Sequence, residues 1–160
     1  MKITKILLNA FQNENIHFSS IKVCDIDQDV LANLKKQFPS IKMTDSAGKA
    51  SDCEIVFIAL HPPVIKDTIE NFKESISENT IVISLAPKIS IDKLTSILNT
   101  KKIIRMIPNA TSYLNKGYNP VTFSEEFSSD EKSEILDLLV VLGKTFETDE
   151  AKLESYAIVS

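Results

Sequence analysis

Short apolar runs alternate with amphipathic segments along most of the chain. The runs are rich in β-branched residues, which is typical of strands that are buried on both faces of a parallel sheet. We predict strands over residues 21–24, 41–43, 55–60, 80–85, 102–106, 121–123 and 145–147.

The segments between these runs carry apolar residues at helical spacing. Asp27 and Ser90 are placed to cap two of them, and Ser128 with Glu131 has the pattern of a capping box. Pro39 stops one helix, and a glycine closes another. We predict helices over residues 28–38, 63–72, 91–98, 129–142 and 150–160, a turn or short helix over 46–51, and a helix followed by a loop within 4–20.

This order predicts an α/β chain, a Rossmann-like doubly wound and mostly parallel sheet with helices on both faces. The rhythm changes at residues 108–120, which are rich in Asn, Pro, Ser and Gly and indicate a long loop. The whole chain can form one doubly wound α/β unit, and residues 150–160 look like a helix that is cut short.

Composition narrows the classes of partner. The chain has 160 residues, 43% hydrophobic and 25% charged, with a net charge of -4. That charge disfavours nucleic acids and anionic membranes, so we expect a small-molecule substrate or another protein as partner. No apolar run reaches the roughly 20 residues of a membrane helix, and a cytoplasmic location is the expectation. Cys24 and Cys53 flank or lie in strand-like segments and are expected to be buried thiols.

Candidate chemistry lies where strands end, because ligands of an open parallel sheet bind beyond the carboxyl ends of its strands. Asp25 follows a strand directly and is placed to accept hydrogen bonds from an adenosine ribose, or else to open the turn before the next helix. A carboxylate there favours NAD over NADP, because it repels a 2′-phosphate. His61 follows another strand and is more suited to line a ligand than to act in proton transfer, and no neighbouring residues complete a metal site.

The end of the strand over 102–106 continues into a loop that holds Asn109. Its amide can orient a ligand, or it can satisfy backbone groups of the loop. The residues alone leave the function open at this point.

Three segments together resemble the pyrroline-5-carboxylate reductase family. That family has Ala-Val-Lys-Pro after one strand, Ser-Ile-Ala-Ala-Gly-Ile in a later strand, and Arg-x-Met-Pro-Asn-Thr-Pro followed by a glycine. This chain reads Ala-Leu-His-Pro over 59–62, Ser-Leu-Ala-Pro-Lys-Ile over 84–89, and Arg-Met-Ile-Pro-Asn-Ala-Thr over 105–111, with Gly117 following. The order and spacing agree over about 100 residues, which is more specific than a single fingerprint.

The resemblance implies a reductase that converts the imine 1-pyrroline-5-carboxylate to proline with NADH or NADPH. It places the cofactor near two sets of residues, Leu60, His61 and Pro62 and then Leu85, Ala86 and Pro87. Ser46 stands where the family often has a ribose-binding asparagine, and Asn109 would support the loop around the reacting ring. It assigns no catalytic residue and no metal. It also implies that residues 1–149 are a dinucleotide-binding domain and that residues 150–160 begin a helix leading into a helical dimerisation domain beyond residue 160. A homodimer or larger assembly is expected only when that domain is present.

The chain departs from the family at its beginning. Family members start with a strand and a G-x-G-x-x-G turn, whereas roughly nine residues, including all of those glycines, are absent after residue 3 here. The gap is either a true deletion or an omission in the sequence as written. On this interpretation Met1 to Ile3 should lie in the middle of the sheet. Three substitutions also weaken the transfer of roles: Lys88 for a glycine, His61 for a lysine and Thr111 for a proline.

Two other functions remain open. The chain fits a non-catalytic binding or regulatory protein that kept the fold and lost cofactor binding, because the missing glycines are those that approach a pyrophosphate. It also fits another nicotinamide oxidoreductase with the same first domain, such as a deazaflavin-dependent or prephenate-type dehydrogenase, because a fold does not fix a function.

Overall fold

The computed structural model describes the backbone of residues 2–159, and the side chains of these residues except 2, 62, 63 and 157–159. Its strands are β1 Lys22–Cys24, β2 Lys42–Thr44, β3 Ile55–Ile58, β4 Ile81–Ser84, β5 Ile103–Met106, β6 Gly117–Phe123 and β7 Gly143–Glu147. Its α-helices are α1 Lys2–Asn13, α2 Gln28–Gln37, α3 Ala47–Ser51, α4 Pro62–Phe72, α5 Ile91–Ile97, α6 Ser129–Leu139 and α7 Glu150–Val159, and its 3-10 helices are η1 Lys73–Ser75, η2 Ala110–Leu114 and η3 Val140–Leu142.

The strands form two separate sheets. β1 and β2 make a parallel pair, while the other five make a sheet in the order β3-β4-β5-β6-β7. Within the larger sheet, only the β5–β6 pair is antiparallel. The prediction of a Rossmann-like, mostly parallel α/β fold is therefore confirmed, but the strands do not join into one continuous sheet.

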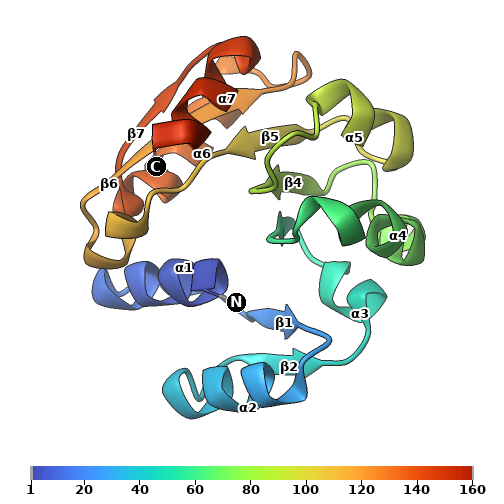
Figure 1. Cartoon of the computed structure of the whole chain (residues 1–160), viewed down its shortest axis with the longest axis vertical. Helices are drawn as coiled ribbons and strands as arrows, with labels where there is room; N and C mark the ends of the chain where they lie inside the picture. Colours follow the sequence, from blue (N-terminus) through green and yellow to red (C-terminus); the bar gives the residue numbers. More distant parts are fainter. Residues whose placement is uncertain (1, 160) are drawn as a thin grey trace.

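Helices cover both faces of the larger sheet. On one face, Ile83 and Ile104 pack with residues of α1 and α6 such as Phe11 and Leu139. On the other face, Val82 packs with residues of α4 and α5, which are the crossover helices between parallel strands. Figure 1 shows α1 (blue) between the larger sheet and the small sheet with α2. The alternation of side chains along β4 thus serves two hydrophobic cores.

The expected strand at the amino terminus is a helix instead. Met1 lies outside the described residues, but Lys2 and Ile3 belong to α1, so their predicted place in the middle of the sheet is wrong. Ile3, Leu7 and Phe11 recur every four residues and all pack into the core below the helix. Because this apolar face continues without interruption to Phe11, a helix buries more of it than a strand of three residues can.

The predicted long loop over residues 108–120 is shorter than expected. It contains the 3-10 helix η2, which Asn115 ends with a left-handed backbone (φ 59°), and strand β6 already begins at Gly117. Gly117 lies directly opposite Gly143 in the β6–β7 pair. A Cβ atom on Gly143 would stand 2.2 Å from the Gly117 nitrogen, so the two backbones approach as only glycines permit. This contact defines where β6 starts.

The predicted helix starts are confirmed. Asp27 accepts hydrogen bonds from the amides of Asp29 and Val30, and Ser90 accepts one from Lys93. Ser128 and Glu131 form the capping box of α6. The helix is shorter than predicted, because α6 gives way at residue 140 to a 3-10 turn.

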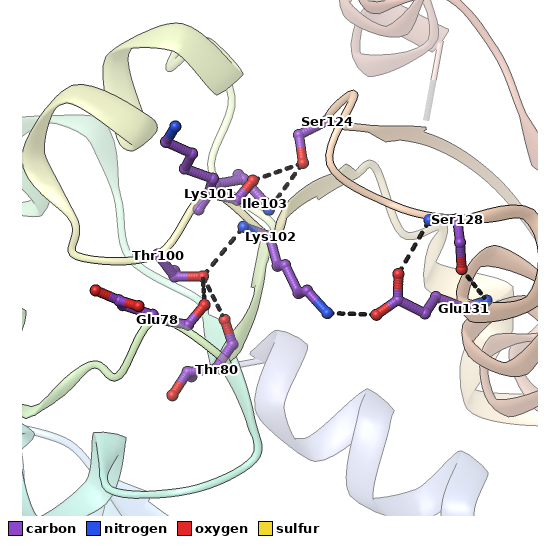
Figure 2. Close-up of polar contacts among 9 residues, drawn as sticks. All are labelled: Glu78, Thr80, Thr100, Lys101, Lys102, Ile103, Ser124, Ser128 and Glu131. Atoms are coloured by element: carbon purple, nitrogen blue, oxygen red, sulfur yellow. Dashed lines mark hydrogen bonds and ion pairs between the residues drawn. The ribbon is translucent and has the colours of Figure 1, made fainter.

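A polar network ties the amino ends of β4 and β5 together (Figure 2). The fully buried Thr100 donates from Oγ1 to the Thr80 carbonyl at 2.8 Å and accepts from the Lys102 amide at 3.0 Å. The Lys102 ammonium in turn pairs with Glu131 of α6. These bonds fix the strands at the end of the sheet that lies opposite the candidate site.

Candidate functional site

Three predicted loops meet at the carboxyl edge of the larger sheet. They follow β3, β4 and β5, which are adjacent parallel strands, so Leu60, Leu85 and Asn109 come from neighbouring positions along one edge. His61 is exposed and is the N-cap residue of α4, but its side chain makes no capping bond. The imidazole is thus available to solvent, and Pro62 begins the helix.

The loop after β4 is mostly core. Leu85 and Ala86 are buried, at 8% and 1% exposure, and pack on opposite faces of the sheet. Pro87 is half-buried, and Lys88 is exposed with a left-handed backbone (φ 62°), a conformation that favours glycine, the residue that the resembling family has at this position. The side chains of Leu85 and Ala86 are therefore turned into the core, whereas those of Pro87 and Lys88 are placed to meet a ligand.

Asn109 is occupied by its own loop. Its Oδ1 accepts hydrogen bonds from the amide and hydroxyl of Thr111, at 2.8 and 2.6 Å, and so caps η2. Its backbone amide donates to Asn119 Oδ1 at 3.1 Å. The sequence left two roles open for Asn109, orienting a ligand or bonding the backbone of its own loop. These contacts are of the second kind.

Asp25 and Ser46 lie at the small sheet, after β1 and β2. Asp25 Oδ1 accepts from the Asp27 amide at 3.0 Å, while Ser46 Oγ accepts from Lys49 at the start of α3. Burial, and then the nearby charges of Asp25 and Asp45, raise the pKa of the Cys24 thiol. Two carboxylates therefore lie near this thiol, at the carboxyl ends of β1 and β2.

Two open pockets flank these loops. One, of about 690 Å³, lies against the small sheet and is lined by Lys22, Lys42, Asp45 and other residues, but neither by Asp25 nor by Ser46. The other, of about 730 Å³, includes Pro87, Lys88 and Arg105. The larger pocket therefore adjoins the predicted loop after β4, whereas the smaller one lies beside the predicted residues of the small sheet rather than on them.

Sequence reasoning missed the ion pairs at the second pocket. Arg105 of β5 is 2% exposed, and its guanidinium pairs with Glu150 at 2.9 Å and with Glu154. Burial acts to raise the pKa of Glu154, but the hydrogen bond and charge of Arg105, with the Lys88 amide, outweigh it and hold that pKa below its ordinary value. The sequence offers two signals, an arginine within an apolar strand and two glutamates four residues apart on a helix, but neither identifies the other as its partner.

Over residues 2–159, the described His, Cys, Asp and Glu residues form no group of three or more that could hold a metal ion. Within the same span, no helix combines the length and apolarity needed to cross a bilayer.

Comparisons with known proteins show the family of the chain. The family described as "NADP oxidoreductase coenzyme F420-dependent" matches residues 2–88, more than half of the chain. Among curated relatives, the pyrroline-5-carboxylate reductase of Corynebacterium melassecola is 22% identical over 99% of this chain and 60% of its own length. The Escherichia coli enzyme of the same name is 26% identical over 72% of this chain and 44% of its own length.

Solved structures share the fold. A pyrroline-5-carboxylate reductase from Coxiella burnetii superposes with a TM-score of 0.84 at 22% identity, covering 99% of this chain and 60% of that one. A pyrroline carboxylate reductase from Plasmodium falciparum with NADP bound gives 0.80 at 18% identity, over 95% and 56%. Prephenate dehydrogenase from Aquifex aeolicus gives 0.76 at 13% identity, over 98% and 61%. The chain thus belongs to the family of coenzyme F420-dependent NADP oxidoreductases and corresponds to the N-terminal, NAD(P)-binding domain of the pyrroline-5-carboxylate reductases, about 60% of the length of the first of these relatives.

Proposed function

We propose that this chain is the nucleotide-binding part of a pyrroline-5-carboxylate reductase-like oxidoreductase. The observation that carries the proposal is the meeting of three loops, residues 59–62, 84–89 and 105–111, at the carboxyl ends of three adjacent strands. Ligands of open α/β sheets bind at this edge. The reaction would be the reduction of the imine 1-pyrroline-5-carboxylate to proline, in the cytoplasm, with hydride supplied by the nicotinamide cofactor.

The residues present fit the two ends of a dinucleotide but not its middle. Asp25 follows β1, where an adenosine ribose would be held, and Pro87 borders the open pocket at the nicotinamide side. A pyrophosphate needs a close backbone approach, whereas the three glycines of this chain, Gly48, Gly117 and Gly143, all lie elsewhere. We therefore derive no catalytic step through the cofactor from this chain alone.

The carboxylates of the small sheet support a preference for NAD. Asp25 and Asp45 both act on the Cys24 thiol, so a 2′-phosphate on a ribose at this place would meet two negative charges. A ribose with a free 2′-hydroxyl would instead donate a hydrogen bond to Asp25.

The substrate, its pocket and the assembly of the enzyme are further parts of this proposal. Because the chain spans about 60% of its first curated relative, the substrate pocket, the substrate itself and a homodimer formed through a C-terminal helical domain are all proposals. Helix α7 would be the start of that domain, in keeping with the helix predicted over residues 150–160. The partner in the reaction would be a small molecule, with neither nucleic acid nor membrane involved.

The specific test is a titration with NADH and NADPH. Because the pyrophosphate site is incomplete, we expect weak binding, in the millimolar range, with NADH tighter than NADPH. Asp25→Asn should weaken the binding of NADH and narrow the difference in affinity between NADH and NADPH. The amide oxygen of asparagine still accepts the hydrogen bond from the Asp27 amide but carries no charge. Asp92→Asn, in the first turn of α5, is the matched control and should change neither affinity.

No binding of either nucleotide at millimolar concentration would overturn the reductase proposal for this chain and favour the non-catalytic alternative. A second assay separates the reductase from other nicotinamide oxidoreductases such as a prephenate dehydrogenase. It supplies 1-pyrroline-5-carboxylate to the protein with its C-terminal domain, and an absence of proline formation there would count against the proposed substrate.

A further inference from the structure

Two carboxylates of α7 hold the backbone of the loop that follows β4. The Lys88 amide donates to Glu154 Oε1 at 3.1 Å, and the Ile91 amide donates to Glu150 Oε1 at 2.8 Å. The partners are 66 and 59 positions apart in the sequence, so these are tertiary contacts and not turns of the loop itself. The part of the loop that follows Pro87 is therefore held at both ends from α7.

The same carboxylate oxygens bind Arg105. Glu150 Oε1 accepts from Arg105 Nη1 at 2.9 Å, and Glu154 Oε1 accepts from Nη2. Arg105 is buried and lies directly beside Ser84, the last residue of β4, in the β4–β5 pair. Each oxygen thus joins a guanidinium fixed in the sheet to one amide of the loop, through charge-assisted hydrogen bonds. We call Arg105, Glu150 and Glu154 the α7 clamp.

The backbone of the loop needs such support. Lys88 has a left-handed backbone (φ 62°), which is unfavourable for a residue with a Cβ atom. A conformation of this kind persists where surrounding contacts hold it. The hydrogen bond from the Lys88 amide to Glu154 is a contact of this type, because it fixes the peptide group that joins Pro87 to Lys88.

The clamp and the pocket beside this loop share their residues. The pocket of about 730 Å³ is lined by the three residues of the clamp together with Pro87, Lys88, Ser90 and Ala151. Pro87 is half-buried and directly precedes the residue that Glu154 holds. The position of the Pro87 ring at this pocket therefore depends on the position of α7.

We propose that Glu150 and Glu154 are positioning residues, which set the backbone of residues 87–91 and so the place of the Pro87 ring on the nicotinamide side of the site. Glu154 acts through the Lys88 amide and Glu150 through the Ile91 amide. The role toward a nicotinamide rests on the proposed function, whereas the hold on the loop rests only on the contacts of the clamp.

Amide hydrogen exchange of the whole chain, followed by NMR, tests the hold on the loop. Glu154→Leu should speed exchange at Lys88 by at least about tenfold and change Ile91 little, and Glu150→Leu should do the reverse. Glutamine at either position should restore protection, because its amide oxygen still accepts. Lys152→Gln, on the same helix and outside the clamp, is the matched control.

This pattern differs from that of a general loss of stability, which would also speed exchange in the middle of the sheet, at Ile83 for example. Equal acceleration of Lys88 and Ile91 in both leucine variants would overturn the hold on the loop, and so would no acceleration. If the leucine variants do not fold, the scalar coupling across the hydrogen bond from the Lys88 amide to the Glu154 carboxyl group is measured in the parent chain. Its absence would overturn the proposal.

Titrations with reduced nicotinamide mononucleotide and with AMP test the role at the ligand. Glu154→Leu should weaken binding of the nicotinamide mononucleotide by at least about threefold and leave AMP unchanged, while Glu154→Gln should resemble the parent. Unchanged affinity for the nicotinamide mononucleotide would overturn this role. A parent chain that binds neither nucleotide would overturn the proposed function and this role with it, but the exchange rates would still decide whether α7 holds the loop.

Discussion

Arg105 of β5 donates from Nη1 to Glu150 Oε1 at 2.9 Å, across 45 residues of sequence. A second glutamate, Glu154, accepts from the other guanidinium nitrogen one turn later on α7. Together they fasten the last described helix to the middle of the sheet. The Nε atom of Arg105 is buried without a hydrogen-bond partner, so the guanidinium depends on these two carboxylates.

Replacing Arg105 with methionine should destabilise the chain by about 1–3 kcal/mol, because both carboxylates lose a charged partner but are exposed enough to regain some water. Adding Glu150→Gln and Glu154→Gln to this variant should recover part of the loss. Urea unfolding measures both effects. Lys152→Gln, which breaks the exposed pair with Asp149, is the control and should stay within about 0.5 kcal/mol of the parent. An equally small effect of the arginine change would contradict a structural role for these pairs.

The hydroxyl of Thr100 is expected to contribute more to the free energy of unfolding than its methyl group. Thr100→Val keeps the shape but leaves the Thr80 carbonyl and the Lys102 amide of Figure 2 without this partner, at a cost of about 1–3 kcal/mol. Thermal or urea unfolding gives the difference. Thr68→Val on the exposed face of α4 removes only a hydroxyl bonded to its own helix, and its stability should hardly change. Similar losses in both variants would show that the network of Figure 2 is not the cause.

Gly143 should tolerate no side chain. It has φ 119° and its added Cβ would meet the Gly117 backbone at 2.2 and 2.3 Å, so Gly143→Ala should cost more than about 3 kcal/mol or prevent folding. Gly48→Ala is the control, because it lies in α3, where the nearest atom to the new Cβ is the end of the Ser75 side chain at 3.0 Å. Soluble yield and unfolding midpoints compare the two. A well-folded Gly143→Ala protein would show that the β6–β7 contact can widen.

The sequence predicts most of this fold because its signals are local. Asp27, Ser90 and Ser128 cap helices where their residue types indicate, and the apolar runs become parallel strands. The prediction of a strand at the amino terminus is wrong because the four-residue repeat of Ile3, Leu7 and Phe11 extends helix α1 over these residues. Local periodicity decided the structure there.

The candidate site was less predictable, since its contacts join distant residues. Nothing near Arg105 in the sequence shows that it pairs with a helix 45 residues later. Asn109 was correctly expected in a loop, but only the structure shows that its side-chain oxygen Oδ1 accepts a hydrogen bond from the Thr111 amide. The cofactor roles of Asp25, Ser46, Leu60, His61, Pro62, Leu85, Ala86 and Pro87 stay predictions.

The capping glutamate of α6 should make stability depend on pH at the acid end. Hydrogen bonding to Lys102, and then to Ser128, lowers the pKa of Glu131 from 4.5 to about 2. Because the pKa is lowered in the folded state, ionised Glu131 stabilises the fold at pH values above its ordinary pKa of 4.5. This contribution disappears as the pH falls from about 4.5 to about 2. The free energy of unfolding of Glu131→Gln should therefore lie below that of the parent at pH 6 and approach it near pH 2. Glu134→Gln, on an exposed position of the same helix, should follow the parent throughout. A constant difference across this range would exclude the ion pair as its source.

The Cys24 thiol reports on the two carboxylates that support the NAD preference. Burial comes first among the causes that raise its pKa, followed by the charges of Asp25 and Asp45. Because the thiolate is the reactive form, alkylation of Cys24 by iodoacetamide at a fixed pH should be slow in the folded chain. The measurement uses a Cys53→Ser background, so that a single thiol reacts.

Either Asp25→Asn or Asp45→Asn should accelerate this reaction, since each removes a negative charge that disfavours the thiolate. The gain should stay below that of unfolding in urea, because burial remains in both variants. Asp92→Asn on α5 should leave the rate unchanged. If neither carboxylate variant reacts faster, the charges of Asp25 and Asp45 do not act at the ends of β1 and β2, and the physical reason for preferring a ribose without a 2′-phosphate is lost. If only Asp25→Asn does, the preference depends on that residue alone.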